Sequence, residues 1–269
     1  MDDATRAARA LRPFPELLLL GAMRAGTTFL HVALSAHPLI VPMRLKEPQF
    51  FSLRWAEGPR AYRRDLPWRG PAWAYRMAGG RRPLALDASP YYLFHPSAPA
   101  RARQLLGDGF KAIAVLREPG QRAWSHYRFA VARGWETASF EDALAAEDTR
   151  LAGEAERLAR GEERPDAPHQ QISYAARGRY AEQVERWRAA APPGGLLLLK
   201  SEDLFADPQG AVNRVFAFLG LPPAPLPANI PLHAVAPAEM SPGRREMLDA
   251  LFEPSNRRLA EVASIEFGT

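Results

Sequence analysis

The sequence predicts a single α/β domain, in which helices flank a central and mainly parallel β-sheet. Short apolar runs, bounded by proline, glycine or a charged residue, recur along the chain and are typical of buried parallel strands. Segments of helical period separate these runs, as in an alternating β/α architecture. No internal repeat or long low-complexity linker divides the 269 residues. We therefore expect one domain over residues 1–269.

The first predicted strand consists of four leucines, residues 17–20, which stand between Pro15 and Gly21. A run of this length between a proline and a glycine favours a strand over a helix. The other predicted strands are residues 84–86, 113–116 and 196–199. The predicted helices are residues 27–36, 99–106, 122–133, 140–146, 180–190, 209–219 and 244–263.

Two segments are expected to lie outside this regular alternation. Residues 1–14 are polar at first and predict a loosely ordered lead-in. Residues 147–170 are highly charged and predict an insertion made of an exposed helix and a mobile loop.

Composition excludes several classes of function. The chain has no cysteine, so a disulfide scaffold, a zinc–thiolate site, an iron–sulfur cluster and a cysteine nucleophile are all excluded. The apolar run at residues 17–22 is too short to span a bilayer, and the acidic start Met1-Asp2-Asp3 does not resemble a signal peptide. We therefore expect a cytoplasmic protein with no membrane span. The net charge of +5 permits an anionic ligand, but no basic run interleaved with aromatic residues indicates nucleic acid.

The segment from Leu17 to Leu30 is the most informative part of the sequence. A strand runs into a turn that contains Gly21, Arg24 and Gly26, and a helix then begins with Thr27 and Thr28. Such a turn directs backbone N–H groups and the positive end of a helix at one place, where phosphate can bind. Arg24 would neutralise the anion, and the two threonines would cap the helix and donate hydroxyl groups. An ordinary strand–turn–helix junction with a threonine cap is the alternative.

Polar residues also follow the later strands and the first helix. These segments are Lys46-Glu47-Pro48-Gln49-Phe50-Phe51, Asp87-Ala88-Ser89-Pro90-Tyr91-Tyr92, and the stretch from Arg117-Glu118-Pro119 to Ser125. In parallel sheets, ligands bind beyond the carboxyl ends of the strands. We therefore expect these residues to meet at one site.

Together these motifs resemble the sulfotransferases that use 3′-phosphoadenosine 5′-phosphosulfate (PAPS), most of all the branch with heparan-type carbohydrate sulfotransferases and their bacterial relatives. The likeness runs in order from about Pro15 to the end of the chain. It implies a P-loop-like sulfotransferase fold, with PAPS as the sulfuryl donor. The residues that it assigns to PAPS are Arg24, Ala25, Gly26, Thr27 and Thr28 at the 5′-phosphosulfate, and Arg117 and Ser125 at the 3′-phosphate.

The same resemblance assigns the catalytic carboxylate to Glu47, which would remove the proton of the acceptor hydroxyl. Arg24 would stabilise charge on the transferred group, and Lys46 would keep Glu47 ionised or contact the substrate. Because these groups supply the required charge, no metal is expected. His126 is a second candidate for the base, although its side chain points about 100° away from that of Ser125 on the predicted helix.

Two departures from the family pattern stand out. Ala88 occupies the position at which carbohydrate sulfotransferases carry a lysine before Ser-Pro. The basic, glycine-containing cofactor loop of eukaryotic members is replaced by residues 231–236, which include His233.

The predicted function is transfer of a sulfuryl group from PAPS to a hydroxyl or amine of a carbohydrate, lipid or other metabolite. The acceptor is expected to meet residues 53–83 and 147–169. A P-loop-type kinase that uses ATP is a second hypothesis, but the chain lacks the G-x-x-x-x-G-K-[ST] spacing. A non-catalytic anion or nucleic-acid binder is a third, and only the pI of about 9.8 supports it.

Overall fold

Buried apolar strands form the centre of the fold, as their sequences predict. The structure, a computed structural model, describes residues 14–67, 83–164, 166–228, 230 and 239–268. Its five strands pair in parallel in the order β2-β3-β1-β4-β5. The strands are β1 (Leu17–Gly21), β2 (Ile40–Pro42), β3 (Leu84–Ala88), β4 (Lys111–Leu116) and β5 (Leu196–Lys200).

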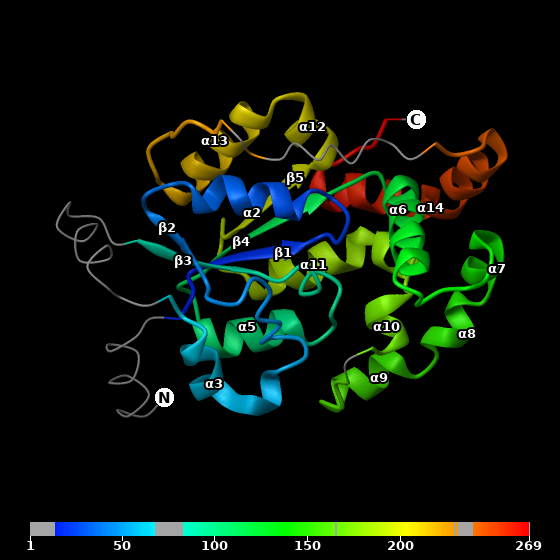
Figure 1. The fold of residues 1–269 in the computed structure, drawn as a ribbon, viewed down its shortest axis with the longest axis horizontal. Helices are drawn as coiled ribbons and strands as arrows, with labels where there is room; N and C mark the ends of the chain where they lie inside the picture. Colours follow the sequence, from blue (N-terminus) through cyan, green and yellow to red (C-terminus); the bar gives the residue numbers. More distant parts are fainter. Residues whose placement is uncertain (1–13, 68–82, 165, 229, 231–238, 269) are drawn as a thin grey trace.

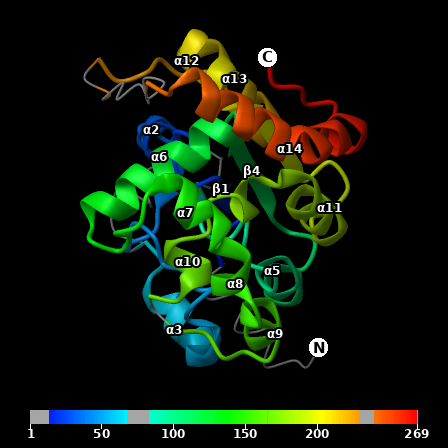
Figure 2. The same ribbon diagram turned by 90° about the vertical axis from the view of Figure 1, so that its right-hand side faces the viewer.

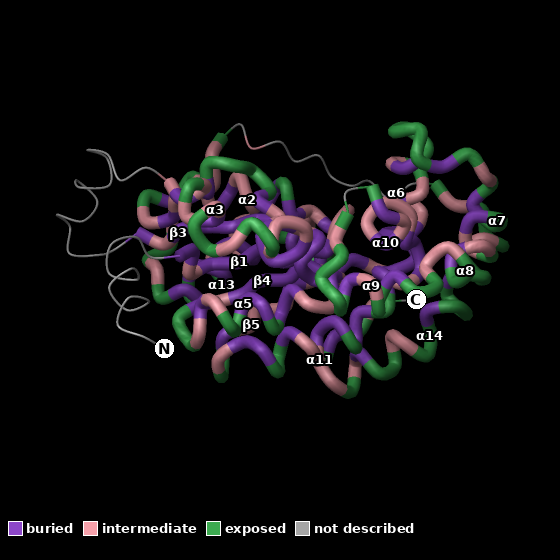
Figure 3. The backbone as a smooth tube through the Cα atoms, turned by 90° about the horizontal axis from the view of Figure 1, so that it is seen from below, coloured by how far each residue is buried: buried purple, intermediate pink, exposed green. Residues whose placement is uncertain are grey.

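Helices cover both faces of this sheet. Figure 1 shows α2, α12 and α13 on one face and α5 and α11 on the other. The strands are therefore shielded from water on both sides, and Figure 3 shows buried residues concentrated along them. The helices are α2 (Thr27–Ser35), α3 (Gly58–Arg64), α5 (Ala98–Leu106), α6 (Pro119–Ala132), α7 (Phe140–Ala145), α8 (Glu147–Leu151), α9 (Glu154–Ala159), α10 (Pro168–Gln171), α11 (Tyr180–Ala190), α12 (Ser201–Ala206), α13 (Pro208–Leu219) and α14 (Pro242–Ala263), with 3-10 helices η1 (Trp55–Glu57) and η2 (Ala176–Gly178).

The helices from α6 to α10 gather at one end of the sheet. Figure 2 views the molecule from that end, with α6, α7, α8 and α10 in front of the strands. The strands are parallel, so the carboxyl ends of β1, β3 and β4 all face the same edge. Every polar segment that the sequence analysis placed after a strand is directed to this edge.

The four predicted strands and seven predicted helices are confirmed, with boundaries that agree to within three residues. Strand β2 was not predicted, since it has only three residues and ends in Pro42. It lies at the edge of the sheet, where a proline removes no central hydrogen bond. The last residue of the predicted lead-in, Phe14, belongs to the packed part of the fold. It is buried, and its ring centre lies 6.0 Å from the ring centre of Tyr62. Residues 1–13 lie outside the described residues.

The charged segment 147–170 differs from the single exposed helix that was predicted. It forms the three short helices α8, α9 and α10, and Glu147, Glu154 and His169 are buried. The Glu147 carboxylate accepts hydrogen bonds from the backbone N–H groups of residues 174, 175 and 176, at 2.7–2.8 Å. Such contacts join the segment to η2 and explain why so many charges are found in a packed region. Residue 165 is not described, and the mobility of the segment stays a prediction.

Candidate active site

The turn between β1 and α2 requires glycine at its last position. Gly26 has a φ of 98°, a backbone conformation that favours glycine. A Cβ atom at this residue would also lie 3.0 Å from the ring of Phe205. Arg24, two residues earlier, has a positive φ of 71°. The turn therefore has two left-handed residues, and this geometry is typical of anion-binding backbone turns.

The N-terminus of α2 opens directly onto this turn. Its first helical hydrogen bond runs from Leu30 N to Gly26 O at 3.1 Å. The N–H groups of residues 27–29 precede that bond and are directed out of the helix end. The predicted threonine cap is wrong, because Gly26 is the N-cap and none of the described side chains caps α2. Thr27 and Thr28 instead lie in the first turn and line the pocket described below.

Two hydrogen bonds join this turn to the end of β4 and to α6. Arg24 Nε donates to Ser125 Oγ at 3.1 Å, and Arg117 Nη1 donates to the backbone oxygen of Arg24 at 3.2 Å. Burial lowers the pKa of both guanidinium groups, and an anion bound beside them would offset that effect. The structure thus brings together the two segments that the sequence analysis assigned to opposite ends of PAPS.

Glu118 holds α6 in place beside these arginines. Its carboxylate accepts hydrogen bonds from Gly120 N at 2.6 Å and Gln121 N at 2.7 Å, so it caps the helix. Pro119 occupies the first helical position, where it displaces no helical hydrogen bond. The Arg-Glu-Pro motif therefore fixes the helix that carries Ser125.

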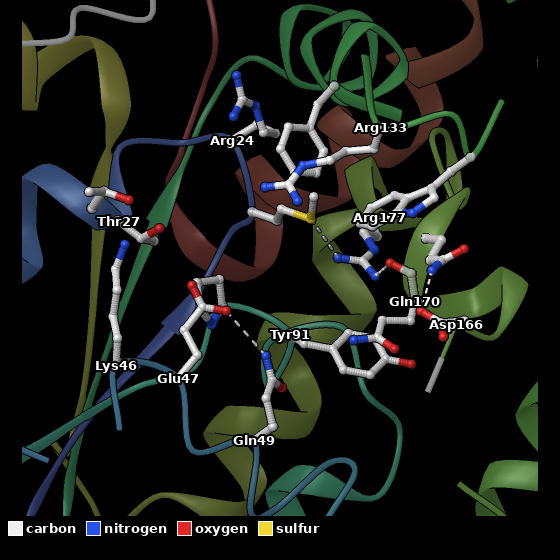
Figure 4. Close-up of a pocket in the computed structure, with 16 residues that line it drawn as sticks. Arg24, Thr27, Lys46, Glu47, Gln49, Tyr91, Arg133, Asp166, Gln170 and Arg177 are labelled. Carbon is white, nitrogen blue, oxygen red and sulfur yellow. Dashed lines mark hydrogen bonds between the residues drawn. The ribbon is translucent and has the colours of Figure 1, made fainter. Parts of the chain in front are cut away.

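A pocket of about 420 Å³ lies beside the turn (Figure 4). Five predicted site residues line it, namely Arg24, Thr27, Thr28, Lys46 and Glu47. Ala25 is fully buried behind the turn. The other lining residues are Met23, Gln49, Pro90, Tyr91, Phe129, Arg133, Trp135, Asp166, Gln170, Gln171 and Arg177.

Glu47 lies between Lys46 and a pair of arginines in this pocket. In Figure 4, Lys46 and Thr27 are on one side of its carboxylate, and Arg133 and Arg177 are on the other. Gln49 Nε2 donates to Glu47 Oε2 at 3.3 Å. Glu47 is exposed as a whole residue, but the protein around its carboxylate still removes part of the water and raises its pKa, while Lys46 and the hydrogen bond from Gln49 act in the opposite direction. The carboxylate is therefore more basic than an ordinary glutamate, as a proton acceptor requires.

The loop that carries Glu47 is held by a buried carboxylate, Asp87, at the end of β3. Asp87 accepts hydrogen bonds from the hydroxyl groups of Tyr62, Ser89 and Tyr92 at 2.6, 2.7 and 2.9 Å. The Ser89 and Tyr92 oxygens in turn accept from the backbone N–H groups of residues 49 and 51, at 3.1 and 3.3 Å. Burial raises the pKa of Asp87 to about 6.

A hydrogen bond from Ser52 orients the side chain of Gln49. Ser52 Oγ donates to Gln49 Oε1 at 2.7 Å, so the amide nitrogen of Gln49 faces Glu47. The φ of Gln49 is 54°, an uncommon value for a residue other than glycine. Sequence reasoning assigned no role to Gln49 or Ser52. The only available signal was their place in the segment after Lys46-Glu47.

His126 does not reach the pocket. Its ring is fully buried, with Nε2 2.9 Å from the backbone oxygen of Gln171 and the ring centre 5.0 Å from that of Tyr174. Burial lowers the pKa of His126 well below its usual value. The predicted rotation away from Ser125 is consistent with these contacts, which describe a packed histidine.

The structure also places four other residues near the candidate site, namely Tyr91, Tyr92, Arg177 and Ala88. Tyr91 lines the pocket, whereas Tyr92 lies in the core. Arg177 lines the pocket, and only 4% of it is exposed. Ala88 is buried at the end of β3. The predicted contacts at residues 68–82 and at His233 lie outside the described residues.

Neither a metal site nor a membrane span is found in the part of the chain that the structure describes. Among the described residues, no three His, Asp or Glu side chains are grouped so that they could hold a metal ion. None of its helices is long and apolar enough to cross a bilayer.

Comparison with known proteins agrees with the fold and with this arrangement. A family model of the sulfotransferase domain matches residues 14–240. The chain therefore belongs to the sulfotransferase domain family. It is 29% identical over 210 residues to the heparan sulfate glucosamine 3-O-sulfotransferase 3B1 of Mus musculus, covering 78% of this chain and 47% of that protein. It thus spans about half the length of the curated relatives it matches.

Two solved structures extend the comparison. A sulfotransferase from Alicyclobacillus acidocaldarius is 29% identical, with a TM-score of 0.67, and the match covers 94% of this chain and 97% of that one. The mouse sulfotransferase SULT7A1, solved in complex with PAP, is 14% identical with a TM-score of 0.52 over 90% of this chain and 84% of that one. The second likeness concerns the fold alone. The first likeness agrees with the family match.

The raised pKa of Asp87 predicts a specific dependence of stability on pH. The folded protein keeps the proton to about pH 6, whereas an unfolded aspartate loses it near 3.8. Stability from this group is therefore full below about pH 3.8 and is lost as the pH rises to about 6. Relative to Asp87→Asn, the parent should lose about 3 kcal/mol of unfolding free energy over this range. Urea unfolding at a series of pH values measures the difference.

The control for this experiment is Asp148→Asn, which changes an exposed carboxylate on α8. Its unfolding free energy should follow that of the parent at every pH. Parallel curves for the parent and Asp87→Asn would show that burial does not shift the Asp87 titration.

Proposed function

We propose that the protein transfers the sulfuryl group of PAPS to a hydroxyl or amine of a carbohydrate or other metabolite, with Glu47 as the base. The observation that carries this proposal is the position of Glu47 in the same pocket as Arg24, Thr27 and the N-terminus of α2. A proton acceptor and an anion-binding turn in one pocket suit acceptor activation beside a sulfuryl donor. The PAP complex of SULT7A1 supports the choice of donor.

The residues around the turn fit the two anionic ends of PAPS. Arg24 and the N–H groups at the start of α2 would bind the 5′-phosphosulfate, because cations and helix N-termini both favour anions. Arg117 and Ser125 would bind the 3′-phosphate. Both side chains are nearly buried and both contact Arg24, so the two phosphate sites share one rigid support.

The chemical step needs one proton transfer and one displacement at sulfur. The acceptor oxygen or nitrogen forms a bond to sulfur while the bond from sulfur to the bridging phosphate oxygen breaks, and PAP leaves. The acceptor proton passes to the Glu47 carboxylate. Negative charge develops on the bridging oxygen, where Arg24, Lys46 and the backbone N–H groups of the turn would stabilise it. Thr27 and Thr28 supply further hydroxyl donors on that side of the pocket.

A radiolabelled transfer assay tests the proposed reaction. The parent protein is incubated with ³⁵S-PAPS and separate sets of glycans, lipids and phenols, and labelled products are counted. We expect transfer to at least one set, and the glycans are the first choice because the curated relatives include heparan sulfate sulfotransferases. ATP labelled at the γ-phosphate should give no labelled product. Phosphate transfer in place of sulfate transfer would contradict the proposal.

The role of Arg117 and Ser125 predicts discrimination between two nucleotides. PAP has a 3′-phosphate and AMP lacks it. Arg117→Gln should weaken PAP binding by about 2–4 kcal/mol, because a charged hydrogen-bonding partner is lost, and Ser125→Ala should weaken it less. Neither change should alter AMP binding strongly. Isothermal titration calorimetry measures both affinities.

AMP also serves as the control for the turn itself, since Arg117 supports Arg24 through a hydrogen bond. Equal losses of PAP and AMP affinity would mean that Arg117 acts only on the turn and does not bind the 3′-phosphate.

The role of Glu47 predicts both a rate and a pH profile. Glu47→Gln removes the base but keeps its shape, so kcat should fall about 10²–10⁴-fold with little change in PAP affinity.

In the parent, activity is present above the pKa of Glu47 and is lost as the pH falls through it. Because Lys46 lowers that pKa, Lys46→Gln should move the acid limb of the kcat profile to higher pH. Single-turnover assays at several pH values measure these effects.

His126→Asn serves for comparison, since it changes a buried ring outside the pocket. This change should lower the free energy of unfolding, while the turnover rate per folded molecule should stay close to that of the parent. A Glu47→Gln protein with parental turnover, alongside an inactive but folded His126→Asn protein, would transfer the role of base to His126.

A further inference from the structure

Arg177 is a buried cation in the pocket that the proposed reaction does not use. It lies in η2, and only 4% of the residue is exposed. None of the ion pairs found among the described residues includes it. Arginine is seldom buried to this extent without a carboxylate, because removing the charge from water is unfavourable.

The contacts of Arg177 hold the guanidinium group without an ion pair, although the Glu147 carboxylate favours its charged form. Its Nε donates to Ser173 Oγ at 2.8 Å, and its Nη2 donates to the backbone oxygens of His169, at 3.1 Å, and Gln170. The ring of Tyr91 lies 4.9 Å from the guanidinium carbon. Burial lowers the pKa of Arg177 only to about 10, so the group stays charged at neutral pH.

The remaining nitrogen, Nη1, faces the pocket. Its hydrogen-bond partner is the thioether sulfur of Met23 at 3.3 Å, which is a weak acceptor. Figure 4 shows the guanidinium group of Arg177 between a thioether sulfur, which is the partner of Nη1, and Gln170, whose backbone oxygen accepts from Nη2. A stronger acceptor, such as an anion in the pocket, would bind Nη1 in preference to a thioether.

Arg133 approaches the same part of the pocket from the end of α6. Its guanidinium carbon lies 5.1 Å from the centre of the Phe129 ring, and Arg24 lies at 5.2 Å from that ring. In Figure 4, Arg133 and Arg177 lie on the opposite side of Glu47 from Lys46 and Thr27. Trp135, 38% exposed, lines the same pocket.

We propose that Arg177 and Arg133 form a subsite for an anionic group of the acceptor, so that the acceptor is an alcohol or amine that also carries a carboxylate, phosphate or sulfate. This inference rests on the proposed function, since it assigns the transferred group of the donor to the side of Glu47 on which Thr27 and Lys46 lie. The reacting hydroxyl or amine then faces Glu47, and the anionic group extends to Arg177. Trp135 offers an apolar surface for the body of the acceptor.

The architecture keeps the subsite rigid. The Glu147 carboxylate accepts three backbone hydrogen bonds from residues 174–176, directly before Arg177. The Gln183 side chain donates to the backbone oxygen of Arg177 at 3.1 Å. A guanidinium group held in this way loses little further freedom when an anion binds, which favours recognition.

Three sugars test the proposal, because they differ mainly at one carbon. Glucose is neutral, glucuronic acid carries a carboxylate and glucose 6-phosphate carries a phosphate. Each is titrated into the parent, R177Q, R133Q and R188Q, with and without PAP, and followed by saturation-transfer NMR. R188Q removes the same charge from an exposed position of α11 and is the matched control.

In the parent, at least one anionic sugar should bind about tenfold more tightly than glucose, the gain expected for a charged hydrogen bond. This preference should fall about fivefold or more in R177Q and in R133Q and should persist in R188Q. The affinity for PAP, measured by calorimetry, should be the same in all four proteins. The two anionic sugars show whether a carboxylate or a phosphate fits better.

Three results would overturn the subsite: no preference for either anionic sugar in the parent, a preference that survives both R177Q and R133Q, or a loss of PAP affinity in R177Q as large as the loss of sugar affinity. The third result would place Arg177 on the donor side. If circular dichroism shows that R177Q does not fold, the preference in R133Q decides. A parent that does not bind PAP contradicts the proposed function, while the titrations without PAP still test the subsite.

Discussion

The hydrogen bond from Arg117 to the backbone oxygen of Arg24 is the contact on which the candidate site depends. It fixes the turn after β1 against the end of β4, and Arg24 then reaches Ser125 on α6. The parallel pairing of β1 with β4 makes this contact feasible, since both strands end at the same edge of the sheet. Three segments far apart in the sequence thus support one anion-binding turn.

A second support acts on the proposed base. Asp87 collects three hydroxyl groups at the end of β3, and two of them hold the backbone of the loop that carries Glu47. The base therefore depends on a buried network more than on its own surface contacts. This arrangement explains why a glutamate that is open to solvent keeps one orientation in the pocket. Rigid support of reacting groups is what a transfer reaction requires.

The sequence predicted the sheet well because β1 and β4 are apolar runs whose burial on both faces needs no further information. It also placed Arg24, Lys46 and Glu47 in one site, since residues after parallel strands and nearby loops meet at one edge. It did not predict β2, whose three residues carry no strong pattern. Nor could it predict the burial of Arg177, which results from contacts with α10 and Met23 that only the tertiary structure creates. Local patterns therefore identified the turn and the loop with Lys46 and Glu47, and long-range packing determined the burial of Arg177.

The central claim is that the turn after β1 binds the phosphates of PAP rather than those of a nucleoside triphosphate. Calorimetric titration of the parent with PAP, and separately with ATP and magnesium, tests it most directly. Arg117 and Ser125 offer a site for a 3′-phosphate, which ATP lacks, so PAP should bind about a hundredfold more tightly and without added metal. Equal or tighter binding of ATP with magnesium, or PAP binding that needs the metal, would contradict the account.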